Sequence, residues 1–226
     1  KNQPSGIAQI FVSKKGENSI AVASGSNATL FYDRVEIFLD EIMNEDLLLM
    51  QFEIPIKTIT SIINFCSNKK VRSIINPAPA ALLPDEVIKK IWMITPNELE
   101  AEFLTGISVI DKKSTLDAAK KIINKGVEHC IITRGRKGSI WLSNLGGYEF
   151  NVPVVNAIDT TAAGDVFNGY LANAISENLP IEKAIAQAHA AASLSVTIKG
   201  AQTSIPSKEE TITFLKYNPI ISKKIY

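Results

Sequence analysis

Residues 158–165 read Ile158-Asp159-Thr160-Thr161-Ala162-Ala163-Gly164-Asp165, and they lead from a strand-like segment, Val152–Val155, into a helix predicted over Gly164–Glu177. The small residues Ala162, Ala163 and Gly164 let the backbone approach a ligand, and the N–H groups that open the helix favour an anion. Asp165 lies in the first helical turn. Its carboxylate can accept a proton from an attacking hydroxyl or simply complement the helix dipole, and local sequence leaves both interpretations open.

Outward from this stretch, short apolar segments alternate with longer helical ones from about residue 45 onward. Gly106 is expected to end one of these helices and Ser114 to cap the next. The alternation predicts a three-layer α/β fold: a doubly wound, mainly parallel sheet with helices on both faces, whose ligands bind beyond the carboxyl ends of the strands. The predicted strands cover 47–52, 71–75, 91–94 and 130–133, and the other predicted helices cover 57–68, 97–104, 114–124, 181–198 and 208–217.

The beginning of the chain has a different pattern. Gly6–Val12 and Ser19–Ala23 are β-rich runs on either side of a turn-like segment at 14–18, which predicts a hairpin. We expect residues 1–24 to form this small unit and residues 25–226 to form the α/β core. The sequence does not begin with Met, so we expect the true N-terminus to lie upstream.

Composition excludes several classes of protein. The 226 residues suffice for one large domain, and 24 Lys and Arg nearly balance 23 Asp and Glu. That balance gives no reason to expect nucleic acid or a membrane surface as a partner. No apolar run approaches the roughly 20 residues of a membrane span, so we expect a cytoplasmic protein. Cys66 and Cys130 form no CxxC pair and are interpreted as free thiols.

Further polar residues follow other predicted strands. Asn97 and Glu100 lie three apart at a helix start, where they could hold hydrated Mg²⁺ and phosphates or simply form a helix cap. The turn Thr133–Gly138 could contact a nucleotide or merely connect two strands. Glu53 could accept hydrogen bonds from paired sugar hydroxyls or be an exposed loop acid. His189 lies in a helix of small residues, where a histidine more often serves packing.

The stretch from Asp159 to Asp165 resembles the signature of the ribokinase superfamily of sugar kinases, with Ala162 in place of the first glycine of the usual form. Four other segments are similar to family segments and occur in the family's order: Asn76–Ala80, Thr95–Glu100, Thr133–Gly138 and Lys199–Ser204. Each motif alone is weak evidence for this superfamily, whereas the five motifs together are specific evidence for it. No G-x-G-x-x-G follows a predicted strand, which disfavours an NAD dehydrogenase.

The resemblance implies a ribokinase-like fold, with residues 1–24 as part of a β lid, and ATP-dependent phosphorylation of the 5-hydroxyl of D-ribose. Asp165 would be the general base, and the backbone at 162–164 the anion hole. The resemblance also implies Mg²⁺ as the ion that accompanies ATP, K⁺ as an activator of the enzyme, and a homodimer formed through the lid. Sugar contacts fall on Glu53 and Asp165. Nucleotide contacts fall on Asn97, Thr133, Arg134, Gly135, Arg136, Lys137, Gly138, Gly164 and His189. Glu100 would hold Mg²⁺ through water, and the monovalent cation would lie at Asp159, Thr161, Ser195, Ile198, Gly200 and Ser204.

The resemblance begins partway into the family. About the first 90 residues of a family chain of roughly 300 have no counterpart here, and that part carries most of the sugar-binding residues. Two alternatives therefore stay open: a kinase for another sugar or nucleoside of the superfamily, and a noncatalytic nucleotide-binding remnant.

Overall fold

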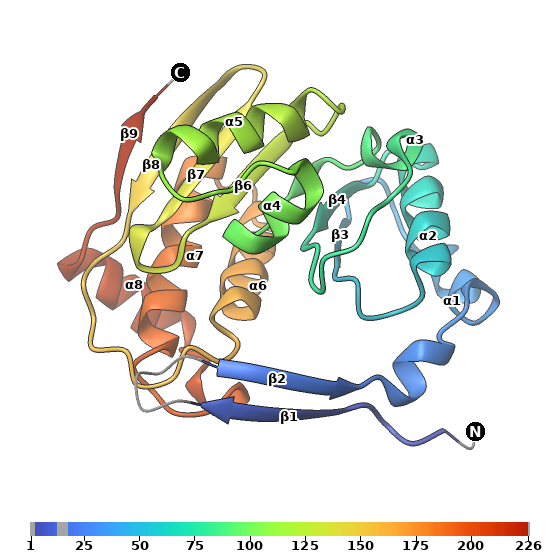
Figure 1. Ribbon diagram of the computed structural model, residues 1–226, viewed down its shortest axis with the longest axis horizontal. Coiled ribbons are helices and arrows are strands. Elements are labelled where there is room, and N and C mark those ends of the chain that lie inside the picture. The colour runs from blue at the N-terminus through green and yellow to red at the C-terminus, as the bar shows by residue number, and fades with distance from the viewer. Residues whose placement is uncertain (1–2, 13–17, 226) are drawn as a thin grey trace.

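The computed structural model describes residues 3–12 and 18–225. Its main sheet has seven strands in the sequential order β3-β4-β5-β6-β7-β8-β9 (Figure 1). Strands β3 to β6 are parallel, and β7, β8 and β9 each run antiparallel to the strand before. The bounds are β3 Leu47–Met50, β4 Arg72–Ile75, β5 Met93–Ile94, β6 His129–Thr133, β7 Ser139–Ser143, β8 Gly146–Asn151 and β9 Ile221–Lys224.

Helices cover both faces of this sheet. Successive strand residues point to opposite faces, and Ile74 belongs to one hydrophobic cluster whereas Ile75 belongs to the other. The Ile75 cluster includes residues of α2 (Ile56–Asn68), α3 (Asp85–Ile88), α4 (Glu98–Thr105) and α5 (Lys112–Ile123). The Ile74 cluster includes residues of α6 (Ala163–Ser176) and α7 (Ile181–Ser195). The predicted three-layer α/β architecture is confirmed.

Shorter elements complete the chain. Helix α1 (Tyr32–Leu39) packs on α2, and α8 (Lys208–Tyr217) packs on α7. Strands β1 (Ile7–Val12) and β2 (Asn18–Ala23) form an antiparallel two-stranded sheet along the lower edge of Figure 1, as predicted. Of the predicted turn at 14–18, residues 14–17 lie outside the described residues. In the described part of the chain, three short 3-10 helices cover Gly25–Thr29, Gly135–Lys137 and Gln202–Ser204.

Two local predictions are wrong. Val152–Val155 forms no strand, because β8 ends at Asn151 and Pro153 has no N–H to donate to a neighbouring strand. Ser114 does not cap α5. The helix begins earlier, at Lys112, and its N-cap is Asp111, whose carboxylate accepts a hydrogen bond from the Ser114 N–H at 2.7 Å. The Ser114 hydroxyl completes the reciprocal box by accepting from the Asp111 N–H at 3.0 Å.

Within the described ranges, no helix combines the length and apolarity that crossing a membrane requires. Both cysteines, Cys66 and Cys130, are buried free thiols.

Candidate active site

A polar pocket of about 230 Å³ lies where the carboxyl ends of β4, β5 and β6 meet the start of α6. Each strand delivers polar residues to it, because the carboxyl ends of parallel strands share one edge of the sheet. A backbone bridge joins Asn97 to Thr133, and the Thr133 N–H donates to Pro96 O at 2.9 Å. The pocket is lined by Asn76, Ala78, Thr95, Asn97, Glu100, Thr133, Thr160, Ala162, Ala163, Gly164, Asp165, Phe167 and Asn168.

The start of α6 forms one wall of this pocket. Ala162, the N-cap residue, has φ 61° and ψ 9°, in the left-handed region. This conformation costs a non-glycine residue roughly 1–2 kcal/mol, so the glycine of the usual family form would suit the position better. The N–H of Ala163 donates to Thr160 O at 3.3 Å, a weak contact. Because Ala162, Ala163 and Gly164 line the pocket, the positive end of the α6 dipole lies at its wall.

Asp165 lies in the first turn of α6, as predicted. Asp165 is an exposed residue, and it is among the residues that line the pocket. Partial removal of water raises the pKa of the Asp165 carboxyl above its usual value. A raised pKa brings the group closer to the range in which a carboxylate works as a general base.

Asn97 and Glu100 form a complete capping box at the start of α4. The Asn97 side chain accepts from the Glu100 N–H at 2.9 Å, and the Glu100 carboxylate accepts from the N–H and the amide of Asn97, both at 2.8 Å. Burial raises the pKa of Glu100, the Asn97 N–H lowers it, and the negative charge of Asp165 raises it further. Both interpretations of the pair are compatible, because the capping residues also line the pocket.

A buried chain of hydrogen bonds runs beneath the start of α6, and the sequence analysis missed its key member, Asn168. The Asn76 amide donates to Thr95 O at 3.0 Å, and the Thr95 hydroxyl donates to Asn168 Oδ1 at 2.7 Å. The Asn168 amide then donates to Gly164 O at 2.9 Å. This chain ties the ends of β4 and β5 to the first turn of α6. A polar residue on the buried face of an apolar helix, four residues after Gly164, is the signal that could have revealed it.

A second pocket of about 530 Å³ adjoins the first and shares Thr160 and Ala163 with it. Gly135, Arg136 and His189 line it, together with Val152–Val155 and residues of α7. The His189 Nε2 lies 2.7 Å from Ser139 Oγ. Burial, and secondarily the nearby Arg134, lowers the pKa of His189 to about 3, so the imidazole is neutral at physiological pH.

The turn between β6 and β7 separates its basic residues. Arg134 is buried, and its guanidinium donates to Lys137 O and to Glu149 Oε1, both at 3.0 Å. Lys137 points outward and pairs with Glu98 at 3.1 Å. Gly138 closes the turn with φ 76°. The strand-turn-strand interpretation is confirmed, since β6 and β7 pair antiparallel from Thr133 opposite Ser139.

Segments predicted to hold a monovalent cation lie side by side. The two Asp159 oxygens accept from the Thr161 N–H and the Gly200 N–H, both at 2.9 Å. Interactions with Thr161 and Gly200 hold the pKa of Asp159 below its usual value. Ser195 and Ser204, which lie close to Gly200 in the sequence, are buried. Their hydroxyls donate to Ala192 O and Ala201 O, respectively. The side chain of Ile198, by contrast, is 47% exposed. Asp159 thus joins the loop before α6 to the loop after α7.

Glu53, the predicted sugar contact, is a site residue that the structure leaves apart from both pockets. It lies in an exposed bend after β3, and it is not among the residues that line either pocket.

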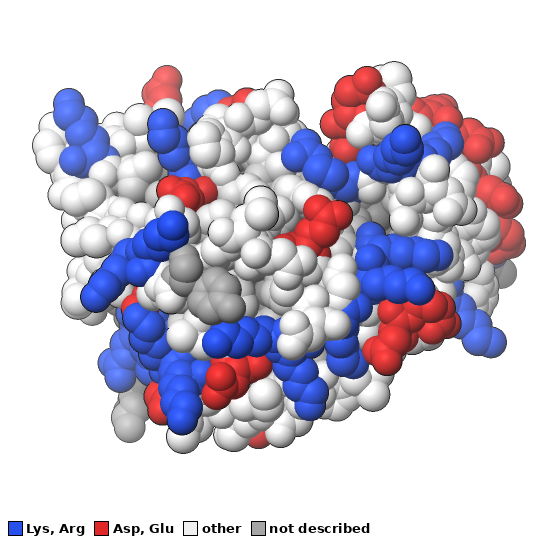
Figure 2. Space-filling view, turned by 90° about the horizontal axis from the view of Figure 1, so that it is seen from above, with Lys and Arg blue, Asp and Glu red and all other residues white. Residues whose placement is uncertain are grey.

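Among the described residues, no three His, Cys, Asp or Glu side chains cluster as a metal site would require. Both oxygens of the Glu100 carboxylate already accept hydrogen bonds from Asn97. Glu100 therefore fits Mg²⁺ as a residue that could hold the ion through water rather than as a direct ligand. Figure 2 shows Lys and Arg intermingled with Asp and Glu over the face seen there, with wide uncharged areas between them.

Comparisons with known proteins show the family to which the chain belongs. The family model described as pfkB family carbohydrate kinase matches residues 1–208. A ribokinase of Haemophilus influenzae is 44% identical over 213 residues, which cover 94% of this chain and 69% of the relative. A deoxyribokinase of Salmonella typhimurium is 34% identical and is matched over 95% of this chain and 70% of its own length.

Among solved structures, the Arabidopsis thaliana ribokinase complexed with ribose and ATP superposes with a TM-score of 0.84 at 29% identity. That match covers 95% of this chain and 70% of the plant enzyme. The family model covers most of the chain, and the relatives match nearly all of it. The chain therefore belongs to the pfkB family of carbohydrate kinases.

Proposed function

We propose that this chain is the greater part of an enzyme that transfers the γ-phosphoryl group of ATP to the 5-hydroxyl of D-ribose. The observation that carries the proposal is the 230 Å³ pocket, which brings Asp165 and the start of α6 together with the Asn97–Glu100 pair from a distant segment of the chain. The 44% identity to a bacterial ribokinase supports ribose as the sugar.

Asp165 acts in this proposal as the general base. Its carboxylate accepts the proton of the attacking hydroxyl, the sugar oxygen forms the new bond to phosphorus, and the bond between the γ-phosphorus and the ADP oxygen breaks. The backbone at 162–164 and the positive end of α6 stabilise the negative charge on the transferring group. Mg²⁺, held through water by Glu100, would supply further positive charge at the phosphates.

The 530 Å³ pocket is the proposed nucleotide base site. Its wall of Val152–Val155 is apolar, which suits an adenine ring, and His189 offers a neutral edge to it. Thr133, Gly135 and Arg136 approach the nucleotide from the turn, with Asn97, Gly164 and Gly138 around the phosphates. Arg134 is buried and Lys137 pairs with Glu98, so we assign Arg134 to bracing this turn and Lys137 to its rim.

Three remaining expectations are part of the proposal. K⁺ would lie between the two loops that Asp159 joins, with backbone carbonyls as most of its ligands. Residues 1–24 would act as a lid separate from the core at 25–226. The lid would mediate a homodimer, which the exposure of Ile7, Phe11 and Val22 supports (63%, 64% and 60%).

The deciding experiment measures phosphorylation of D-ribose by MgATP, and compares Asp165→Asn with Asp117→Asn, an exposed control on α5. We expect Asp165→Asn to lower kcat by at least about 10³-fold with little change in ATP affinity, because loss of a general base affects mainly the transition state. Near-normal turnover by Asp165→Asn would rule out the base assignment.

A second candidate substrate follows from the deoxyribokinase relative, which is 34% identical. A kinase for 2-deoxyribose would need the same base and nucleotide site and would differ only at the sugar. Turnover of 2-deoxy-D-ribose above that of D-ribose would favour it. ATP binding without turnover of any sugar by an upstream-extended chain would favour the noncatalytic alternative.

A further inference from the structure

Asn168 is a buried amide in the second turn of α6, and both ends of its side chain are hydrogen-bonded. Only 3% of the residue is exposed. Its Oδ1 accepts from the Thr95 hydroxyl at 2.7 Å, and its Nδ2 donates to Gly164 O at 2.9 Å. A carbonyl oxygen can only accept, so the amino group has to face Gly164 and the amide oxygen has to face Thr95. The orientation of the Asn168 side chain is therefore fixed by its two partners.

The Thr95 hydroxyl is the donor that selects this orientation. Its proton has two acceptors nearby, Asn168 Oδ1 at 2.7 Å and Ile75 O at 3.5 Å. Asn168 takes the proton, since 3.5 Å lies beyond the usual range of an O–H···O hydrogen bond. Thr95 itself is held through its main chain, because its N–H donates to Ile75 O at 2.9 Å and its carbonyl accepts from the Asn76 amide at 3.0 Å. The donor thus belongs to the ordered edge of the sheet.

The acceptor at the other end, Gly164 O, connects Asn168 to the candidate active site. A peptide unit is planar and trans, so the Gly164 carbonyl and the Asp165 N–H share one plane and point in opposite directions. Holding the carbonyl therefore also fixes the direction of the Asp165 N–H. The hydrogen-bond ladder of α6 begins with the Val166 N–H, which donates to Ala162 O at 2.9 Å. The Asp165 N–H precedes this bond and points towards the start of the helix, where the 230 Å³ pocket lies.

Gly164 depends on such a tether. A Cβ added there would meet no atom within 4 Å, so packing does not hold this residue in place. Glycine also loses more conformational freedom on ordering than any other residue. Ala162, two residues earlier, is strained by its left-handed φ of 61°. The beginning of α6 thus joins a strained residue to a flexible one, and the Asn168 amide holds the carbonyl between them and the helix.

We propose that Asn168 is a positioning residue for phosphoryl transfer. It holds the peptide between Gly164 and Asp165 so that the Asp165 N–H is directed at the transferring group. Thr95 lies two residues before Asn97, so the same hydrogen bonds also set the first turn of α6 relative to the capping box of α4. The orientation of the peptide follows from the hydrogen bonds alone, and only its effect on turnover rests on the proposed function.

The tether is tested on the chain itself by NMR relaxation of the backbone amides in Asn168→Leu. Leucine is close to asparagine in size and suits a buried position, but it cannot donate to Gly164 O. We expect the order parameter of the Asp165 N–H to fall clearly below the value of about 0.85 that marks a rigid backbone. The order parameter of Ala174, a buried residue further along α6, should stay at that value. An unchanged order parameter at Asp165 would overturn the proposal.

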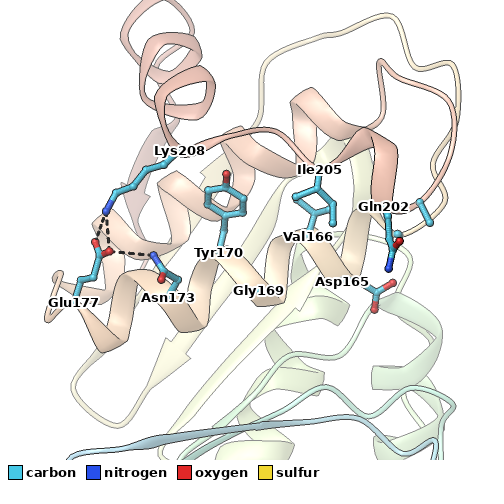
Figure 3. Close-up of a pocket in the computed structure, with 11 residues that line it drawn as sticks. Asp165, Val166, Gly169, Tyr170, Asn173, Glu177, Gln202, Ile205 and Lys208 are labelled. Atoms are coloured by element: carbon cyan, nitrogen blue, oxygen red, sulfur yellow. Dashed lines mark hydrogen bonds and ion pairs between the residues drawn. The ribbon is translucent and has the colours of Figure 1, made fainter.

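Asn173→Leu is the matched control, because it makes the same chemical change five residues further along the same helix. Asn173 is exposed, and Figure 3 shows it on the open side of α6, with Gly169 between it and Asp165. We expect this variant to keep the order parameter of Asp165 and the turnover of the parent. A loss as large as that of Asn168→Leu would contradict a specific role for Asn168.

Kinetics with D-ribose and MgATP separate positioning from a loss of folded protein. We expect Asn168→Leu to lower kcat at least about tenfold, which is part of the roughly 10²–10³-fold that complete loss of an oxyanion-hole donor costs. The KM for ATP should stay within about twofold, because the donor acts mainly in the transition state. The number of ATP sites per chain, measured by isothermal titration, should not change. A fall in kcat that is matched by a fall in the number of ATP sites would refute the positioning role.

Two variants of Thr95 test the same role without altering α6. Thr95→Val removes the hydroxyl that orients Asn168, whereas Thr95→Ser keeps a hydroxyl at the same position. We expect Thr95→Val to repeat the loss of turnover and Thr95→Ser to retain most of the activity. Equal turnover by these two variants would count against the hydrogen bond as the cause.

The positioning role and the proposed function fail in different ways. A parent chain that transfers no phosphoryl group to D-ribose would contradict the proposed function, and the order parameter of Asp165 would still decide whether Asn168 holds the peptide. A parent chain that phosphorylates D-ribose, with Asn168→Leu equally active, would contradict the positioning role and leave the proposed function intact.

Discussion

Two glycines of the turn between β6 and β7 should respond very differently to alanine. Gly138 has φ 76°, and a Cβ there would lie 1.8 Å from Phe150 O and 2.9 Å from the Phe150 carbonyl carbon. Phe150 is buried and its backbone is paired with Ser139 in the sheet, so it has little room to move. Gly135 has φ 52°, but a Cβ there would meet nothing within 4 Å.

The expected magnitudes follow from these contacts. Gly135→Ala adds only the cost of a left-handed alanine, roughly 1–2 kcal/mol. Gly138 has φ 76° and ψ −137°, outside the left-handed helical region, so Gly138→Ala adds roughly 1–3 kcal/mol of backbone strain and a forced backbone displacement of roughly 1–3 kcal/mol, roughly 2–6 kcal/mol in all. At about 2–4 °C of Tm per kcal/mol for a chain of this size, the expected losses are about 2–8 °C for Gly135→Ala and about 4–24 °C for Gly138→Ala.

Thermal unfolding followed by far-UV circular dichroism measures both variants under the same conditions. An isothermal titration with ATP then reports on the turn itself, because a displaced turn should also weaken nucleotide binding in Gly138→Ala more than in Gly135→Ala. Equal Tm losses for the two variants would refute the argument, since it depends on the carbonyl of Phe150 being in the way.

Three further predictions concern the charges of the site. His189 should remain neutral in NMR titrations down to about pH 4, because its pKa is about 3. Between about pH 6.5 and pH 3 the unfolded chain binds a proton at this imidazole and the folded chain does not. The free energy of unfolding should therefore decrease as the pH falls from about 6.5 toward 3. The acid limb of kcat/KM against pH should lie above the usual Asp pKa, because burial raises the pKa of Asp165 and the base must be ionised; a limb at or below pH 3.8 would contradict this. Arg134→Met should destabilise the fold by about 1–3 kcal/mol in urea unfolding, and Glu149→Gln in the same chain should add less than its separate effect, because the two groups share one hydrogen bond.

Local sequence was enough to predict the helices and strands that are set by neighbouring residues in the chain. Alternation of apolar strands with amphipathic helices predicted the α/β layers, and Gly106 does end α4 in the left-handed conformation that glycine adopts without strain. The prediction at Ser114 was wrong because Asp111, three residues earlier, competes for the same role and begins the helix one turn sooner. The prediction at Val152–Val155 was wrong because β-branched composition suggested a strand where Pro153 prevents pairing.

The residues of the candidate site likewise fall into those that the sequence predicted and those that only the tertiary structure revealed. The sequence determined which segments carry chemistry, because small residues before a helix and polar residues after strands have local physical meanings. Only the tertiary structure decided which of them meet. Arg134 is turned inward by Glu149, fifteen residues further on, Asn168 reaches Thr95 across 73 residues, and Glu53 lies apart from the pocket. The open edge at β3 was equally invisible in the sequence, because Leu47–Leu49 has the composition of an interior strand, and only the order of the described strands shows that β4 alone pairs with it.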